Sequence, residues 1–246
     1  MRVSIVTVVY NNRDLVQDAI DSVAAQDYGD MEHILIDGGS TDGTMNIVKS
    51  YRHLKWISEM DDGLYDAMNK GVMMASGDII GLLNSDDLFK DQYVVSRVVD
   101  FFKNSTNVDI VFGNLEYVKR ENPKDIVRVW RTGDFYPSFF EDGLVPPHPA
   151  VYLKRKVYDK HLFDLDFKLA ADYEFMLRIF KDPEFKVGYL DSICVSMRLG
   201  GVTNNSLRNI INGNIEIKNA WHKNGFSLPH FFWMKRIIFK LKQFLK

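Results

Sequence analysis

The sequence predicts an α/β fold, in which a mixed Rossmann-like sheet is flanked by helices and followed by a C-terminal amphipathic helical tail. The first observation is that β-branched runs alternate with helix-spaced segments through the first 83 residues. Such alternation gives a parallel sheet with right-handed crossovers. The second is a change of pattern after residue 107, where strand-like runs follow one another with short turns. The third is a final segment that combines an apolar stripe with basic residues.

The first half of the chain supplies four strands and three helices. Val3–Val9 is a β-branched run, and the apolar residues that follow recur at helical spacing at Leu15, Ala19, Ile20 and Val23. Further strands are expected at His33–Ile36, which ends at Asp37, at Lys55–Ser58 and at Asp78–Leu83, and further helices at Thr44–Tyr51 and Leu64–Ala75.

The second half is organised differently. Strands are expected at Val108–Phe112, Leu115–Lys119, Ile126–Trp130, Val187–Leu190 and Ile193–Met197, with a turn at Asn122–Asp125. Pro146–Pro149 is predicted to be an extended connection, because a residue before proline avoids the helical region. Helices are expected at Ala171–Phe180, which Asp182-Pro183 ends, and at Leu207–Lys223, which Asn224-Gly225 ends. No internal repeat or low-complexity linker divides the chain.

Composition narrows the class of protein. The 246 residues are 46% hydrophobic and 26% charged, which is ordinary for a globular protein. A net charge of −2 argues against general nucleic-acid binding. The single Cys194 excludes an internal disulfide and suggests a reducing compartment. The apolar run near Met1 is too short for a signal peptide, and no segment is long and uncharged enough to span a bilayer.

The most informative stretch is Ile80-Gly-Leu-Leu-Asn-Ser-Asp-Asp87, an apolar strand that ends in two adjacent carboxylates. Ligands of open α/β sheets bind at this carboxyl edge. Adjacent carboxylates repel unless a cation or proton lies between them, and Mg²⁺ or Mn²⁺ prefers such oxygens and bridges to phosphates. The pattern therefore indicates a metal-assisted nucleotide site. The alternative is a solvated acidic turn before a helix that begins near Asp91.

Two other strand ends carry polar groups, at Thr7–Tyr10 and at Asp37. An aspartate at a strand end can accept a hydrogen bond from a base or a ribose, and paired acids beyond it can hold a metal on a diphosphate. Neither a dinucleotide fingerprint nor a P-loop occurs, which argues against a dehydrogenase and an NTPase. These strand ends together favour a nucleoside diphosphate as the ligand.

Five motifs together resemble the family 2 glycosyltransferases with the GT-A fold. They are Ser4-Ile-Val-Thr-Val-Val-Tyr-Asn11, Asp37-Gly-Gly-Ser-Thr-Asp-Gly43, Asp62-Gly-Leu-Tyr-Asp-Ala-Met-Asn-Lys-Gly71, Ala75-Ser-Gly-Asp78 and Leu83-Asn-Ser-Asp-Asp87. Three later motifs are similar to bacterial enzymes that build O-antigen and colanic-acid-type polysaccharides. These are Pro147-His-Pro-Ala150, Ala170-Ala-Asp-Tyr-Glu174 and Met197-Arg-Leu-Gly-Gly-Val202.

The resemblance implies an inverting transfer of one sugar from a nucleotide-sugar donor. By this analogy Asp37 contacts the nucleobase, Asp86 lies near the ribose, Asp87 binds Mn²⁺ or Mg²⁺ on the diphosphate, and Asp172 is the catalytic base. The nucleotide-sugar site implied by the motifs comprises Thr7, Val9, Tyr10, Asn11, Asp37, Asp66, Asn69, Lys70, Asn84, Ser85 and Asp86, and the acceptor side comprises His148, Glu174, Gly200 and Gly201.

The chain departs from the family pattern at two points. Many members carry a Glu-Asp pair where this chain has Ala171-Asp172, which makes Glu174 a rival for the base. The Gln-x-x-Arg-Trp motif of processive synthases is absent, which indicates addition of single sugars. Plainer roles stay open: Asp37 and Asp42 as turn residues, His148 as a backbone partner, Gly200-Gly201 as a turn rather than a lid, and Trp130 and Tyr136 as core rather than sugar-stacking residues.

The tail has bulky apolar residues at positions 231, 234, 238, 241 and 245, and its basic residues are Lys235, Arg236, Lys240, Lys242 and Lys246. This combination predicts a helix in an anionic membrane interface, with packing on the domain or in a homodimer as the alternative. We therefore expect a glycosyltransferase domain at 1–225, with a nucleotide-sugar half at 1–114 and an acceptor half at 115–225, and a membrane-associating tail at 226–246.

The expected activity is non-processive transfer from a UDP-hexose to an undecaprenyl-diphosphate-linked saccharide. The expected location is cytoplasmic, at the inner face of the inner membrane. A nucleotidyltransferase also holds metals with acids at a sheet edge, but it usually needs a basic Gly-rich loop that this sequence lacks. A non-catalytic nucleotide-sugar-binding protein is the other alternative.

Overall fold

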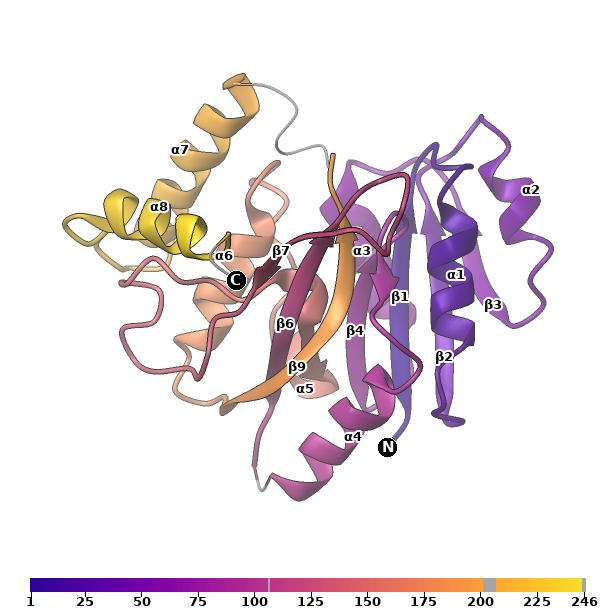
Figure 1. The fold of residues 1–246 in the computed structure, drawn as a ribbon, viewed down its shortest axis with the longest axis horizontal. Helices are drawn as coiled ribbons and strands as arrows, with labels where there is room; N and C mark the ends of the chain where they lie inside the picture. The colour runs from indigo at the N-terminus through magenta and orange to yellow at the C-terminus, as the bar shows by residue number, and fades with distance from the viewer. Residues whose placement is uncertain (106, 201–206, 245–246) are drawn as a thin grey trace.

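In the computed structural model, which describes residues 1–105, 107–200 and 207–244, a curled mixed sheet is flanked by helices (Figure 1). The strands of the described part run in the order β3-β2-β1-β4-β8-β6-β9-β5, and β7 pairs with β6 outside this path. The predicted α/β class and the C-terminal helices are confirmed.

Four parallel strands form the first half of the sheet. These are β1 (Val3–Val9), β2 (Met31–Asp37), β3 (Leu54–Ser58) and β4 (Ile79–Asn84). Every residue of β1 is buried, which is usual for a strand covered on both faces. The carboxyl ends of all four strands therefore meet at one edge.

The second half of the sheet mixes strand directions. Its strands are β5 (Leu88–Phe89), β6 (Ile110–Val118), β7 (Ile126–Trp130), β8 (Val151–Lys154) and β9 (Val187–Arg198). β8 runs antiparallel to both β4 and β6, whereas β6 and β9 run parallel. The acceptor half proposed from sequence is thus joined to the first half through β8.

Helices cover both faces of the sheet. One face carries α3 (Leu64–Met74), α5 (Arg155–Lys160) and α6 (Ala171–Phe180), and the other carries α1 (Val16–Ala24), α2 (Thr44–Val48) and α4 (Val94–Asn104). The largest apolar cluster lies on the α3 and α6 face and continues into α7 (Leu207–Lys223).

The tail helix α8 (Phe232–Lys242) packs against the domain. Figure 1 shows α7 and α8 together at the end of the molecule opposite α2. Phe232 is fully buried, and its ring lies edge-on to Trp221 of α7 at 5.7 Å. No helix in the described ranges is long and apolar enough to cross a bilayer.

Two predicted breaks in the strands were wrong. β6 continues through Gly113-Asn114, and β9 continues through Asp191-Ser192. These turn-forming residues lie beside each other at an irregularity in the register, where Asn114 donates a hydrogen bond to the Asp191 carboxylate at 3.0 Å. A β-carbon on Gly113 would lie 2.5 Å from the Cys194 sulfur, so the glycine permits close strand approach rather than a turn.

Other differences concern short elements. The Pro-rich connection contains a 3-10 helix at His148–Ala150, and β8 and α5, which follow it, were not predicted. The helix expected from Asp91 begins at Val94, because the Asp91 carboxylate accepts the Tyr93 amide and forms a turn first. The helix expected at Thr44–Tyr51 ends at Val48, although the amides of Lys49, Ser50 and Tyr51 continue as turns.

Candidate active site

The carboxyl edge of the parallel strands gathers the first group of predicted residues. Val9 pairs with Asp37, Asp37 pairs with Ser58, and Asn84 ends the neighbouring strand β4. The Asp37 carboxylate is completely buried and accepts the Ser40 amide at 3.1 Å and the Ser58 hydroxyl at 2.6 Å. It therefore has a fixed orientation at the edge.

The loop after β1 is tied to the loop after β2. Asn11 adopts a left-handed φ of 46°, its amide donates to the Ser40 hydroxyl at 2.8 Å, and its side chain accepts the Thr41 amide at 2.8 Å. Asn12 in turn donates to the Ser85 hydroxyl beyond β4 at 3.0 Å. The three loops thus form one rim that includes Asn11 and Ser85, and Asp37 is buried beneath it.

Arg198 holds the acidic corner after β4. The Asp87 carboxylate accepts the Asn84 side chain at 3.0 Å and the Arg198 amide at 3.2 Å. The Arg198 guanidinium donates to the Asp86 carbonyl at 2.9 Å and pairs with Asp18 of α1. The sequence analysis did not predict Arg198 as a site residue. It belongs to the motif that begins at Met197, but it is distant from Asp87 along the chain.

The electrostatics of this corner suit a divalent cation. Burial, and after it the charge of Asp86, raise the pKa of Asp87 to about 7, although the hydrogen bonds from Asn84 and Arg198 act in the opposite direction. A hard cation would relieve both effects, and carboxylate oxygens are its preferred ligands. Among the described residues, no group of three or more acids, histidines or cysteines is placed so that it could hold a metal ion by itself. Mg²⁺ needs no such cage, since it usually takes one or two carboxylates plus water and substrate phosphates.

Asp172 lies at the start of α6 with a hydrogen-bond partner for each carboxylate oxygen. Tyr65 donates to Oδ1 at 3.1 Å, and His148 Nδ1 lies 3.3 Å from Oδ2. Burial favours the neutral acid, but the His148 contact and the Tyr65 hydroxyl outweigh it and lower the pKa of Asp172. The carboxylate is therefore ionised at neutral pH and able to accept a proton.

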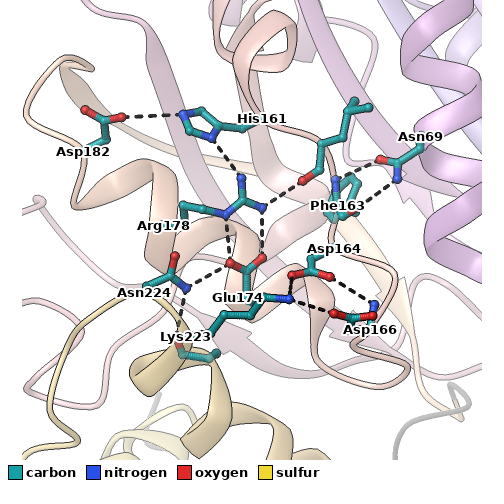
Figure 2. A network of polar contacts seen from close by, with 12 residues as sticks. Asn69, His161, Phe163, Asp164, Asp166, Glu174, Arg178, Asp182, Lys223 and Asn224 are labelled. Atoms are coloured by element: carbon teal, nitrogen blue, oxygen red, sulfur yellow. Dashed lines mark hydrogen bonds and ion pairs between the residues drawn. The ribbon is translucent and has the colours of Figure 1, made fainter.

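Glu174, the rival base, is engaged elsewhere. Figure 2 shows its buried carboxylate in a bidentate pair with Arg178, at 2.8 and 3.0 Å, and in a hydrogen bond from Asn224 at 3.0 Å. Arg178 also contacts His161 and the Leu162 carbonyl. This network ties α6 to the end of α7 and to the loop before α6, so Glu174 fixes the helix that carries Asp172.

A cavity of about 330 Å³ opens beside Asp172. Its walls come from β6, β7, the 3-10 helix, α6, α7 and α8, and they include His148, Asp172, Tyr117, Trp130, Arg128, Arg236 and Lys240. The volume lies in the range of small-molecule sites. Trp130, one of the two sugar-stacking candidates, lines this cavity, whereas Tyr136 does not.

The remaining predicted residues lie at varying distances from these groups. Thr7 is buried within the sheet and bonded to His33, Val9 packs in the α1–α2 cluster, and the Tyr10 side chain is exposed. Asp66 and Lys70 form an ion pair on α3. Asn69 exchanges two 2.9 Å hydrogen bonds with the Phe163 backbone, as Figure 2 shows. Gly200 has a φ of 110°, and Gly201 lies outside the described residues.

Three residues that contact Asp172 or line the cavity were not predicted as site residues. Tyr65 belongs to a quoted motif, but its distance from Asp172 in sequence hid their contact. Arg128 lies on a strand without a motif. Arg236 was assigned to a membrane surface, although Phe232, Arg236, Lys240 and Gln243 recur at helical spacing and mark a second face of the tail.

Comparison with known proteins gives the family. Residues 4–162 match the family model described as "Glycosyl transferase family 2". The chain belongs to this family. A glycosyltransferase of Mycobacterium tuberculosis, itself uncharacterised, is 35% identical over 187 residues, which cover 72% of this chain and 68% of the relative. Family 2 membership favours glycosyl transfer over the nucleotidyltransferase alternative.

A second relative and three solved structures extend the comparison. The PGL/p-HBAD biosynthesis glycosyltransferase of Mycobacterium bovis is 28% identical, covering 82% of this chain and 78% of the relative. S. aureus TarS, residues 1–349, has a TM-score of 0.71 at 19% identity, covering 100% of this chain and 71% of TarS. The mannosyltransferase PcManGT from Pyrobaculum calidifontis, solved with GDP-Man and Mn²⁺, has a TM-score of 0.68 at 18% identity, covering 99% and 69%. TarS solved with UDP also has a TM-score of 0.68 at 18% identity, covering 100% and 71%. These structures share the GT-A fold of this family 2 chain.

Proposed function

We propose that this family 2 glycosyltransferase transfers one sugar, with inversion, from a UDP-hexose to a hydroxyl of a lipid-linked saccharide. The observation that carries the proposal is Asp172, an ionised carboxylate with two hydrogen-bond partners on the wall of a cavity large enough for a sugar. The acidic corner at Asp86 and Asp87 lies at the sheet edge where α/β proteins bind nucleotides. Relatives in fold that were solved with UDP or with GDP-Man and Mn²⁺ support a nucleotide-sugar donor.

In this mechanism Asp172 removes the proton from the acceptor hydroxyl as its oxygen attacks the anomeric carbon. The bond between that carbon and the diphosphate oxygen breaks, and the nucleoside diphosphate leaves. A carboxylate is a suitable base because the hydroxyl becomes acidic enough to lose its proton only as its oxygen bonds to the anomeric carbon, and such a base contributes about 10²–10⁴-fold. His148 and Tyr65 hold the carboxylate in one orientation.

Asp87, with Asp86 beside it, would hold the divalent ion. When bound, Mn²⁺ or Mg²⁺ would neutralise the negative charge that develops on the leaving diphosphate. The chain itself supplies the rim at Asn11, Asp37 and Ser85, which would orient the nucleoside. We retain the other motif residues, Thr7 to Tyr10, Asp66, Asn69, Lys70 and Asn84, as proposed donor-side positions, some of which support the rim rather than contact the ligand.

We also propose that the acceptor is held at a membrane surface, as in O-antigen-type polysaccharide synthesis. The surface would be the cytoplasmic face of the inner membrane. The support is the outer face of α8, where Phe231, Met234, Ile238 and Leu241 are 72%, 53%, 46% and 62% exposed. Apolar side chains gathered on one helix face suit an interfacial position. A homodimer would cover the same face. In this proposal residues 1–225 form the glycosyltransferase domain and residues 226–246 form the membrane-associating tail, with α8 packed on the domain.

The test of the catalytic assignment compares Asp172→Asn with Glu174→Gln at saturating UDP-sugar. We expect Asp172→Asn to keep donor binding and to lose at least a hundredfold in turnover, because an amide cannot accept the proton. Glu174→Gln should lose stability rather than chemistry, since its contacts hold α6. Full activity of Asp172→Asn would overturn the mechanism, and the absence of any turnover in the unmodified protein would favour a binding protein.

The donor side is tested separately with Asp87→Ala. UDP binding measured by calorimetry should strengthen when Mn²⁺ is added to the unmodified protein and should not respond to Mn²⁺ in the variant. Equal UDP affinity for both proteins, with and without Mn²⁺, would show that Asp87 is not the metal ligand.

A further inference from the structure

The cavity beside Asp172 is unusually rich in cations on one side. Arg128 projects from β7, and Arg236 and Lys240 project from α8, while Asp172 is the only carboxylate among the lining residues that the structure describes. None of the three cations is ion-paired with a carboxylate in the described part of the chain. By contrast Lys235, on the adjacent position of α8, pairs with Asp142 at 2.8 Å. The charge inside the cavity is therefore left for a ligand.

Arg236 carries the clearest signal. Its Nε and Nη1 atoms are buried and have no hydrogen-bond partner among the described residues. Burial lowers the pKa of Arg236, while the neighbouring Tyr173 and Asp172 partly offset this. Leaving guanidinium donors buried and unsatisfied costs free energy, because each has lost its water without gaining an acceptor. A ligand with oxygen acceptors would remove that cost.

The surrounding contacts hold Arg236 and Arg128 in place before any ligand binds. The Arg236 guanidinium lies 5.2 Å from the ring centre of Tyr173, the residue after Asp172. Arg128 lies 3.9 Å over the Tyr117 ring and donates to Gln243 at 2.9 Å. Planar guanidinium groups held over aromatic rings present their edge donors in fixed directions, which suits bidentate binding of phosphate.

We propose that this cavity binds a phosphate group of the acceptor, so that the substrate is a saccharide joined to its carrier through phosphate. The inference rests on the proposed function, in which Asp172 deprotonates the acceptor, and deepens it by placing the charged part of that acceptor against Arg236, Arg128 and Lys240. Three cations opposite one carboxylate match a dianionic group better than a single carboxylate.

The position of α8 explains why the phosphate belongs to the acceptor rather than to the donor. One face of α8 lines the cavity through Arg236, and the opposite face exposes Ile238 and Leu241. A carrier lipid lying along the exposed face would bring its phosphate to the inner face within the thickness of one helix. The donor diphosphate is instead expected at the Asp86-Asp87 corner, and neither residue lines this cavity.

The experiment uses probes that carry the charged group without the unknown sugar. Octyl phosphate, octanoate and octyl glucoside, each below its micelle concentration, are titrated by calorimetry into the full chain that has been saturated with UDP and Mn²⁺. Saturation blocks the donor site, so a probe that still binds does so elsewhere. The proteins are the unmodified chain, Arg236→Met, Arg236→Lys, and Lys242→Met as a matched control on an exposed position of α8.

We expect octyl phosphate to bind the UDP-saturated protein and Arg236→Met to weaken that binding at least tenfold, as loss of a charge-assisted hydrogen bond predicts. Arg236→Lys should recover part of the affinity, and Lys242→Met should stay within about twofold of the unmodified chain. Octyl glucoside should not distinguish the variants. Octanoate should bind more weakly than octyl phosphate, and stronger octanoate binding would overturn the phosphate assignment in favour of an acidic sugar.

UDP binding in the presence of Mn²⁺ tests the proposed function separately from phosphate binding, and it also shows whether each variant is folded. If the unmodified chain binds UDP but not octyl phosphate, this inference fails while the proposed function stands. If UDP itself does not bind, the proposed function fails. If an Arg236 variant has lost UDP binding, Lys240→Met is tested in its place. An octyl phosphate affinity of Lys240→Met equal to that of the unmodified chain would contradict the inference. If UDP displaces bound octyl phosphate, the phosphate binds at the donor site, and the inference is overturned.

Discussion

Asp172 depends on its two neighbours for its chemical state. A buried carboxylate without partners would take up a proton and could not serve as a base at neutral pH. His148 and Tyr65 lower the pKa of Asp172 despite burial. Burial, followed by the charge of Asp172, raises the pKa of Tyr65 well above 10, so the phenol keeps its proton and remains a donor. The pair thus maintains one ionised acceptor beside the cavity.

Tyr65→Phe tests this dependence at the scale of one hydroxyl. Because the phenol lowers the pKa of Asp172, its removal should raise that pKa and move the acidic limb of the kcat/KM profile to higher pH. Turnover at pH 7 should fall roughly tenfold, as loss of a hydrogen bond to a charged group predicts. Tyr158→Phe is the control, since Tyr158 is a buried tyrosine that stacks on Phe175 and is not among the groups that lower the pKa of Asp172. An unshifted acidic limb in Tyr65→Phe would contradict the role.

Single residues were proposed where a motif contained them. The Asp86-Asp87 pair was proposed from the local chemistry of paired acids, and Asp172 was proposed from the resemblance of its motif to family 2 glycosyltransferases. The contacts of Tyr65, Arg198 and Arg236 were not predictable in this way. Tyr65 meets Asp172 across 107 positions, and Arg198 meets Asp87 across 111, so only the folded sheet brings them together.

At the scale of elements, α8 has two faces with different surroundings. The apolar stripe at Met234, Ile238 and Leu241 is exposed, as an interfacial helix requires. The predicted basic charge is distributed differently, because Arg236 and Lys240 line the cavity and Lys235 pairs with Asp142. Membrane attraction should therefore depend less on salt than the sequence implies. Truncation after Gly225 should destabilise the domain, since it removes buried Phe232.

Substitution of the exposed stripe tests membrane docking without removing the helix. Met234→Gln, Ile238→Gln and Leu241→Gln combined should abolish flotation with anionic liposomes and leave UDP binding intact. The physical reason is that these side chains supply the apolar area that would enter the interface. The control is Met60→Gln with Met73→Gln, two exposed methionines away from α8. Equal flotation of the stripe variant and the unmodified chain would indicate that this face does not contact lipid.

Gly143→Ala tests how closely α8 is held. Gly143 has a φ of 77°, and a β-carbon there would lie 2.6 Å from the Arg236 amide nitrogen. The substitution should lower the free energy of unfolding by about 2–4 kcal/mol, through backbone strain and displacement of the helix. Gly133→Ala provides the matched control, because its φ is 73° with no atom within 4 Å. If urea unfolding gives the same loss of unfolding free energy for both variants, the contact between Gly143 and α8 does not contribute to stability.

Element predictions succeeded where periodicity was strong. β1 and α7 have the predicted bounds, Val3–Val9 and Leu207–Lys223, because their patterns are continuous. β6 and β9 were each divided in two, since Gly113-Asn114 and Asp191-Ser192 have the composition of turns. Their polar groups are satisfied across the strand pair, an interaction that the composition of either segment alone does not reveal.

At the scale of the whole molecule, the two ends of the parallel strands carry different groups of residues. The carboxyl edge carries the rim around Asp37 and the acidic corner at Asp87. The side of the sheet away from this edge carries Glu32, whose buried carboxylate accepts the Lys55 ammonium at 2.7 Å and the Ser76 amide at 2.6 Å, together with the Ser4 hydroxyl. These partners belong to β3, the segment before β4, and β1, so a single carboxylate of β2 joins three parallel strands and the segment that leads into the fourth.

Glu32→Gln should therefore loosen the sheet in a pH-dependent way. Burial favours the neutral acid, but the Lys55 ammonium and the serine donors outweigh it and lower the pKa of Glu32 from 4.5 to about 2. A depressed folded-state pKa contributes stability above the unfolded value of 4.5, and this stability is lost as pH falls through about 2. The contribution at pH 7 is at most about 3 kcal/mol, and solvent screening of the half-exposed Lys55 reduces it to about 1–2 kcal/mol.

Urea unfolding of Glu32→Gln and the unmodified chain at pH 7 and pH 3 measures this contribution. The difference in unfolding free energy should be largest at pH 7 and should fall to less than half at pH 3, where the unfolded glutamate is protonated while the folded one is still mostly ionised. Glu121→Gln, at an exposed position, should show no difference at either pH. A Glu32→Gln difference that is equal at both pH values would show that the carboxylate acts through shape alone, and that its charge does not hold these segments together.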